Sequence, residues 1–192
     1  QEAVAKIENK YYATLAKAVE AATEGQTVTL LQNVELENTL TIAAGKVVTL
    51  DLNGKVVSGV SATAGTTAVI TNKGNLTVMT SVEGGKITSQ ALTPDTNWGG
   101  EGEPSFPSYA NNTVRNEGTF TLVSGTIENT SAAGGATYAI DNYIGSTTNI
   151  NGGLVYCQNN IAIRLFCGDN IALNVNGGEV KGTRALWIQL AS

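Results

Sequence analysis

The chain has 192 residues, of which 14% are charged, and its 22 glycines accompany many threonines, asparagines and serines. This length suffices for one domain, residues 1–192, because a chain of this size buries roughly 70% of the surface that its unfolded form exposes. The net charge of −5 argues against a nucleic-acid partner. No apolar run approaches the ~20 residues of a membrane-spanning helix, so we expect no membrane span.

Residues 1–26 are expected to cap the N-terminal end of the domain. Thr14 is a natural N-cap, apolar residues recur at helical spacing between 15 and 22, and Gly25 suits the left-handed conformation that ends a helix. From Thr27 onward apolar and polar residues alternate, as in "VVTLDLN" at 47–53. The sequence therefore predicts one short helix followed by strands with one buried face.

A repeated phrase indicates how these strands are arranged. It consists of an apolar pair, a short polar stretch, a glycine and an alternating strand, and it occurs as "AVITNKGNLTV", "NTVRNEGTFTL", "YAIDNYIGSTTNI" and "IAIRLFCGDNIALNV". Aligned on Gly74, Gly118, Gly145 and Gly168, these phrases define a unit of roughly 22–28 residues, which must stack on a copy of itself to bury its apolar face. The repeat predicts an all-β solenoid, a parallel β-helix. A leucine-rich repeat would need an L-x-x-L-x-L spacing, which is missing.

The two ends of the predicted solenoid differ. The amphipathic helix would cover the first rung, whose apolar top and free strand edge would otherwise pair with another chain. The last segment, "RALWIQLAS", is a strand pattern without a cap. We therefore expect that the chain is a fragment of a longer one or that its last rung contacts a partner.

With these features the chain resembles the right-handed parallel β-helix of the pectate-lyase-like superfamily, in particular the small β-helix modules of secreted and surface-anchored bacterial proteins. The residues that carry the resemblance cover most of the chain: "ATLAKAVEAATEGQTVTLLQNVELENTLTI", "VTLDLNGKVVSG", "GGKIT", "GTIEN" and "GGEVKG". The resemblance implies a secreted or cell-surface location in a bacterium, and association with polysaccharide or with host or cell-surface proteins. It does not imply enzymatic activity, since many such modules are scaffolds or adhesins.

No catalytic residue carries over from this superfamily. Its lyases hold calcium with clustered acidic residues and use an arginine as base, and its hydrolases use several aspartates on adjacent rungs. The four aspartates and three arginines here match neither pattern, and the chain contains no histidine. We therefore expect no catalytic residue, no metal site and no cofactor.

One column of the aligned phrases is charged. It holds Thr71, Arg115, Asp141, Arg164 and then Trp187, on rungs ~4.8 Å apart. One hypothesis makes Asp141 a general base between two cations, but those cations would stabilise its ionised form and make it a poor base. We favour a structural ladder of opposite charges on a solvated face, each pair worth well under 1 kcal/mol.

The neighbouring column holds Asn72, Asn116 and Asn142, followed by Leu165. Stacked asparagines can pass side-chain hydrogen bonds from rung to rung and satisfy main-chain groups at a buried turn. This column predicts an amide ladder that stops at Leu165.

Residues 90–112, "QALTPDTNWGGEGEPSFPSYANN", interrupt the repeat as an inserted loop, and long loops without a strand pattern are often functional. A standard calcium loop starting at Asp95 fails, because its fifth and twelfth positions would be Gly99 and Phe106, and a non-standard cation site is left open. Aromatic rings and carboxylates together suit sugars or apolar partners. The candidate ligand-binding residues are Trp98, Tyr109, Phe106, Asp95 and Glu101. The alternative is that the aromatic rings cover the flank of the solenoid.

Cys157 and Cys167 lie ten residues apart in segments expected to be extended. A disulfide between them is left open, and we favour two small buried hydrophobic side chains.

Two classes of function follow from the sequence. We favour a non-catalytic extracellular module that binds a glycan or a protein partner in the manner of an adhesin. The alternative is a polysaccharide lyase or glycoside hydrolase with an unrecognised acidic site. A groove lined by two carboxylates within ~10 Å of each other would support the enzyme.

Overall fold

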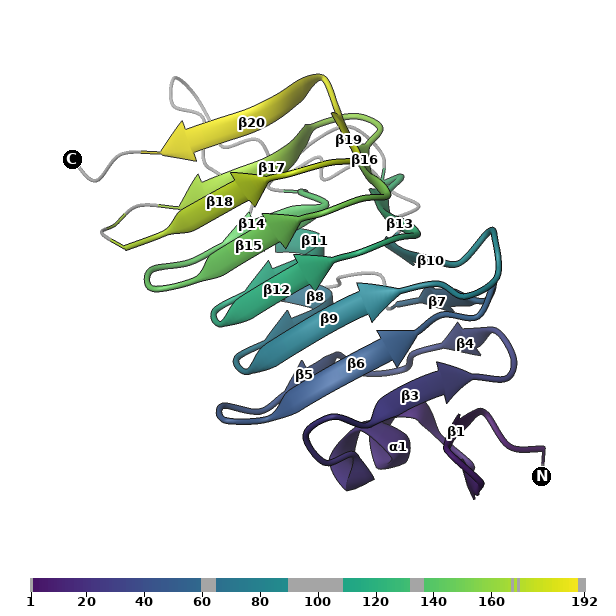
Figure 1. Ribbon diagram of the computed structural model, residues 1–192. Coiled ribbons are helices and arrows are strands. Elements are labelled where there is room, and N and C mark those ends of the chain that lie inside the picture. Colours follow the sequence, from purple (N-terminus) through teal and green to yellow (C-terminus); the bar gives the residue numbers. More distant parts are fainter. Residues whose placement is uncertain are drawn as a thin grey trace.

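The computed structural model describes residues 2–59, 65–89, 109–131, 137–166, 168 and 170–189. Within these ranges the chain forms one short helix, α1 (Leu15–Ala21), and otherwise strands and turns. The strands belong to three sheets, and within each sheet the strands of successive coils stack along one axis, with α1 at the N-terminal end of the stack (Figure 1). No helix in the described ranges is long and apolar enough to cross a membrane.

Sheet A has eight strands in the spatial order β18-β15-β12-β9-β6-β3-β1-β2. All neighbours from β3 to β18 are parallel, whereas β1 pairs antiparallel with both β3 and β2. In chain order the strands are β1 (Ala5–Ile7), β2 (Lys10–Tyr12), β3 (Thr27–Leu30), β6 (Val47–Asp51), β9 (Asn75–Met79), β12 (Thr119–Leu122), β15 (Thr147–Ile150) and β18 (Ala172–Val175).

Sheets B and C each have six strands, and all of their neighbours are parallel. Sheet B comprises β4 (Val34–Glu35), β7 (Val56–Ser58), β10 (Lys86–Ser89), β13 (Thr126–Asn129), β16 (Leu154–Cys157) and β19 (Glu179–Lys181). Sheet C comprises β5 (Leu40–Ile42), β8 (Gly65–Asn72), β11 (Tyr109–Asn116), β14 (Ile140–Asn142), β17 (Ile161–Phe166) and β20 (Arg184–Gln189). Successive strands therefore visit the sheets in turn, which is compatible with a β-helix or solenoid-like fold.

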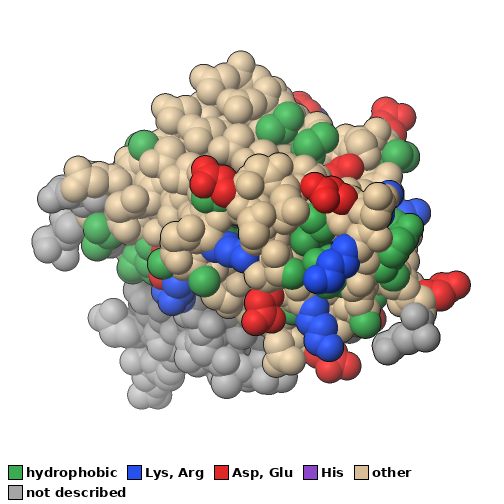
Figure 2. All heavy atoms as spheres, turned by 60° about the horizontal axis from the view of Figure 1, so that its bottom comes forward, with side chains coloured by type: hydrophobic (Ala, Val, Ile, Leu, Met, Phe, Trp, Pro, Cys, Tyr) green, Lys and Arg blue, Asp and Glu red, His purple; other side chains and the backbone are tan. Residues whose placement is uncertain are grey.

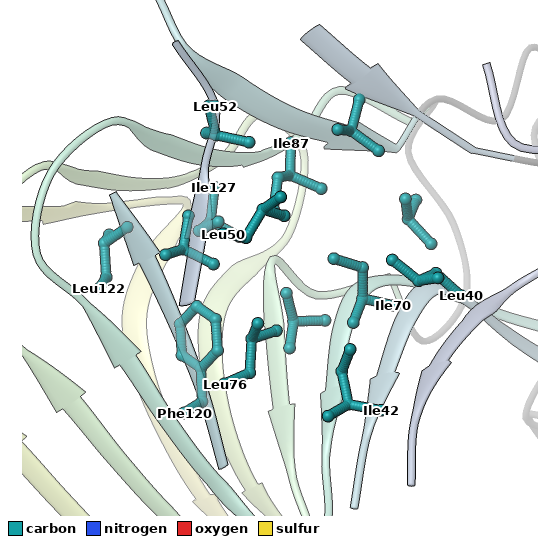
Figure 3. Packing of buried hydrophobic residues seen from close by; sticks show 14 of the residues in the cluster. Leu40, Ile42, Leu50, Leu52, Ile70, Leu76, Ile87, Phe120, Leu122 and Ile127 are labelled. Atoms are coloured by element: carbon teal, nitrogen blue, oxygen red, sulfur yellow. The ribbon is translucent and has the colours of Figure 1, made fainter. Parts of the chain in front are cut away.

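Alternate side chains of each strand point into a core shared by the three sheets (Figure 3). In sheet A one inward column consists of Val28, Leu50, Val78, Leu122 and Ile150, which pair from rung to rung and are each at most 1% exposed. Burying one such side chain contributes roughly 1.5–3 kcal/mol. The alternation seen in the sequence is thus the main source of stability.

The N-terminal cap contains more than the predicted helix. Thr14 is the N-cap of α1, since its hydroxyl accepts a hydrogen bond from the main-chain N–H of Lys17 (3.2 Å). The prediction that Gly25 ends the helix is wrong: Ala22, in an extended conformation, caps α1, and Gly25 lies in the following turn with φ +84°. The sequence analysis also missed β1 and β2, which are three residues each, too short to show a period.

The asparagine column forms the amide ladder that the sequence predicts. Asn72 pairs with Asn116, and Asn116 with Asn142, on successive strands of sheet C. The side-chain N–H of Asn72 donates to Oδ1 of Asn116 (2.9 Å), and that of Asn116 donates to Oδ1 of Asn142 (3.0 Å). At the next rung Asn142 donates instead to the main-chain oxygen of Arg164 (3.2 Å), because its ladder partner is Leu165.

The glycine alignment needs one correction. Gly118 directly precedes Thr119, which pairs with Thr147 of the next rung, whereas Ser146 separates Gly145 from Thr147. The turn between Asn142 and Thr147 is therefore two residues longer than the turn between Asn116 and Thr119, and the glycines are not in register there. The asparagines, rather than the glycines, mark equivalent positions of the coils.

Cys157 is a free thiol, and it is buried as predicted for a small hydrophobic side chain. Burial raises the pKa of this thiol to about 11. Cys167 lies outside the described residues.

Replacing Asn116 with alanine should destabilise the fold by about 3 kcal/mol, because the substitution leaves several buried hydrogen-bonding groups without partners. Those groups include the main-chain oxygen of Thr147 and the main-chain N–H of Gly118, both bound by the Asn116 side chain. Asn75→Ala, at an exposed position of β9, is the matched control and should change stability by less than about 0.5 kcal/mol. Urea unfolding measures both, and similar losses for the two variants would contradict a structural role of the ladder.

Candidate functional site on sheet C

The predicted loop lies largely outside the described residues, and so do four of its candidate binding residues, Trp98, Phe106, Asp95 and Glu101. The fifth, Tyr109, begins β11, and the structure places 109–112 in a strand rather than in a loop. The reason is strand pairing: β11 pairs with β8 from Tyr109, which is opposite Gly65, through Asn116, so residues 109–112 extend the strand. The ligand-binding role of the five residues stays a prediction.

The charged column is aligned as predicted. Thr71 pairs with Arg115, Arg115 with Asp141, Asp141 with Arg164, and Arg164 with Trp187, on five neighbouring strands of sheet C. Their side chains are on the face of the sheet that points away from the core. Sheet C therefore carries a continuous row of charged and aromatic side chains along the axis of the stack.

The prediction that this face is solvated is wrong for Asp141 and Arg164, which are 0% and 8% exposed. Nε and Nη2 of Arg164 each donate to a different oxygen of Asp141, both at 2.7 Å. The side-chain amide of Asn112 donates to Oδ2 of Asp141 as well (3.0 Å). A buried two-pronged ion pair of this kind is strongly coupled, and removing one partner leaves an uncompensated charge.

Aromatic rings explain why the pair is buried. The guanidinium of Arg164 lies between two rings, with its Cζ 4.6 Å from the centroid of Tyr138 and 4.2 Å from that of Phe166. Two rungs from Arg164, on β11, the Cζ of Arg115 lies 4.2 Å from the centroid of Tyr143. Stacking over a ring face stabilises the cation while keeping water away from it.

Ring contacts join these groups into one surface. Tyr143 and Phe166 are 5.3 Å apart between centroids, and Tyr138 and Trp187 are 6.3 Å apart. We call this surface the aromatic–arginine strip, which consists of Arg115, Tyr138, Tyr143, Arg164, Phe166 and Trp187. Tyr138 and Arg164 are its buried part, and the other four side chains are partly open to solvent.

The protonation states in the strip are fixed near neutral pH. Burial raises the pKa of Tyr138 and of Tyr143, with the negative charge of Asp141 adding to both, so both hydroxyls stay protonated. Burial lowers the pKa of Arg164, but its hydrogen bonds with Asp141 and the attraction of that charge outweigh burial, and the pKa is raised overall. The strip therefore offers permanent cations and neutral rings.

Within the part of the chain that the structure describes, two carboxylates contact the strip, and both are engaged in ion pairs. Both oxygens of Asp141 accept hydrogen bonds from Arg164. Glu117 pairs with Nε of Arg115 (2.6 Å) and lies 3.8 Å from Nζ of Lys73. The arrangement is suited to holding a ligand against rings and cations rather than to transferring protons.

Sequence reasoning missed the rings although a signal was present. Tyr143 and Phe166 each lie two residues after a member of the charged column, Asp141 and Arg164 respectively. In a strand, residues two apart share a face. The positions two residues after Asp141 and Arg164 therefore indicate that Tyr143 and Phe166 lie beside the charges.

Two further findings bear on this site. Among the described residues, no three Cys, Asp or Glu side chains gather in a way that could hold a metal ion. No protein-family model matches the chain, and neither a curated protein nor a solved structure is significantly similar to it.

Asp141→Asn should destabilise the protein by about 3 kcal/mol or more, since it leaves the buried Arg164 cation without a counter-charge. Glu117→Gln is the control, because the Glu117 side chain is 27% exposed and its loss should cost less than about 1 kcal/mol. Chemical denaturation of both variants measures the difference. A loss at Asp141 as small as that at Glu117 would mean that the charged pair is hydrated after all.

Proposed function

We propose that this protein is a right-handed parallel β-helix module of the pectate-lyase-like kind, secreted or displayed on a bacterial cell surface, and that it binds a glycan without transforming it. The parallel pairing of three sheets supports the fold part of this proposal. Connections between parallel strands of one sheet are right-handed in about 98% of cases, which favours that hand. The sequence resemblance supports the location and the adhesin-like role.

The aromatic–arginine strip is the observation that carries the binding function. Phe166 and Trp187 present partly exposed rings on the neighbouring strands β17 and β20, Tyr143 presents one directly after β14, and Arg115 lies over the Tyr143 ring. Flat rings pack against the C–H faces of sugars, and guanidinium N–H groups donate to hydroxyl or acidic oxygens. Because the rungs repeat every ~4.8 Å, the strip is elongated and suits a linear chain of sugars.

The strip is also rigid, which reduces the entropic cost of binding. Arg115, Arg164 and Trp187 lie on paired strands of sheet C. The Arg164 guanidinium is also held by two hydrogen bonds to Asp141. The ring of Tyr138 packs against the Arg164 guanidinium and also contacts the ring of Trp187. The ligand would meet preformed rings rather than order them.

The enzyme alternative is less favoured because both nearby carboxylates are engaged in ion pairs. A lyase or hydrolase would need a carboxylate or arginine that is free to exchange a proton with the sugar. The absence of such a group beside the strip concerns the described residues only.

A glycan array identifies a ligand, and Trp187→Ala tests the strip. We expect the substitution to weaken binding at least about tenfold, equivalent to 1.4 kcal/mol. Tyr156→Ala is the matched control, because Tyr156 is a half-buried ring on the outer face of sheet B. It should leave affinity unchanged, and both variants should melt near the temperature of the parent chain.

Equal effects of the two substitutions would contradict binding at the strip. The length of the bound polysaccharide after prolonged incubation decides the alternative. An unchanged length is expected for a binding module, and shortening would favour an enzyme.

A further inference from the structure

A second surface lies at the opposite region of the molecule, where α1 meets sheet C. A pocket of about 280 Å³ opens between them and is lined by Ala16, Val19, Glu20, Thr39, Leu40, Thr41, Ala43 and Lys46. Figure 2 shows the end of the molecule that carries α1, where charged and hydrophobic side chains alternate at the surface. The pocket is slightly smaller than the roughly 300–1,000 Å³ of typical small-molecule sites, and it suits one or two side chains.

One wall of this pocket is a free sheet edge. Strand β5 is the terminal strand of sheet C and pairs only with β8 among the described strands. The main-chain oxygen of Ile42 accepts from the N–H of Lys73 on the β8 side (2.8 Å). Because main-chain groups of successive residues point to opposite sides of a strand, the N–H and C=O of Thr41 point toward the pocket. An unpaired edge of this kind is a template for another strand.

The pocket has an apolar floor and a cation at its rim. Val19 and Leu40 are each 4% exposed and belong to the core. Nζ of Lys46 donates to the main-chain oxygen of Glu20 near the end of α1 (2.6 Å), which holds the ammonium in place. Among the described residues Lys46 has no carboxylate partner in an ion pair, so its charge is available to a ligand.

From these three features we propose that an extended peptide segment binds between α1 and β5, adding a strand to sheet C, inserting an aliphatic side chain into the pocket and placing an acidic group beside Lys46. The N–H and C=O of Thr41 favour a peptide backbone as ligand, since an added strand can accept from the N–H and donate to the C=O at the same time. The apolar floor selects the side chain, and the Lys46 ammonium, which has no carboxylate partner among the described residues, selects the acidic group. This surface is distinct from the aromatic–arginine strip and does not depend on the glycan function.

The probe is the blocked peptide acetyl-Glu-Val-Thr-Val-Glu-amide, titrated into the full chain by calorimetry and by NMR of the backbone amides. We expect saturable binding, with the largest shift at the Thr41 amide. The same peptide with proline in place of its threonine lacks the central N–H and should not bind measurably.

Ala16→Phe and Ala21→Phe form a matched pair of variants, because both residues are exposed on α1 and only Ala16 lines the pocket. Ala16→Phe should abolish binding, and Ala21→Phe should leave it unchanged, with similar melting temperatures. Thr41→Pro removes the N–H that faces the pocket, in an edge position that tolerates proline, and should weaken binding about fivefold. Lys46→Gln should weaken binding of the acidic peptide and leave that of a Gln-Val-Thr-Val-Gln peptide unchanged.

Equal binding to the two phenylalanine variants, or no binding to the parent chain, would overturn the proposal. So would a dimer of the parent chain that Ala16→Phe dissociates, since a second copy would then occupy the edge.

Discussion

The need to satisfy polar groups buried at one turn of each coil constrains the whole structure. The chain leaves sheet C through turns whose main-chain groups are shielded from water, and leaving such a group unpaired costs about 1–3 kcal/mol. Asn72 and Asn116 meet this need in two ways. Within its own coil, Oδ1 of each accepts a hydrogen bond from the main-chain N–H two residues later. Across coils, the side-chain N–H of each donates to Oδ1 of the next asparagine in the column. The three coils that carry Asn72, Asn116 and Asn142 are thereby fixed relative to one another.

This fixed register explains how a surface can form on the outer face of the same sheet. Arg115 and Asp141 immediately precede Asn116 and Asn142, so the ladder that aligns the asparagines also aligns the charges. A slip of one residue would turn every side chain to the other face. The inward asparagines and the outward aromatic–arginine strip are therefore two consequences of one register, one giving stability and the other a preformed surface.

Much of this fold could be predicted from the sequence, because the repeat is expressed in residues that the register constrains. The asparagine column and the charged column were aligned correctly, and the capping helix was placed at Thr14. The burial of Asp141 was missed, because an outward strand position predicts exposure unless neighbouring rings cover it. Glycine was a poorer marker than asparagine, since a turn can gain residues without disturbing the strands, as the turn between Asn142 and Thr147 gains two.

If the amide ladder fixes the register of the coils, it opens only when the whole protein unfolds. Native-state hydrogen exchange of the main-chain N–H of Gly118, which donates to Oδ1 of Asn116, measures this opening. We predict that the free energy of exchange at Gly118 equals that of global unfolding, as for the slowest core amides. The N–H of Lys46 donates to the main-chain oxygen of Ala43 in a turn near the N-terminal end of the stack. Exchange of the Gly118 N–H as fast as that of Lys46 would contradict this prediction.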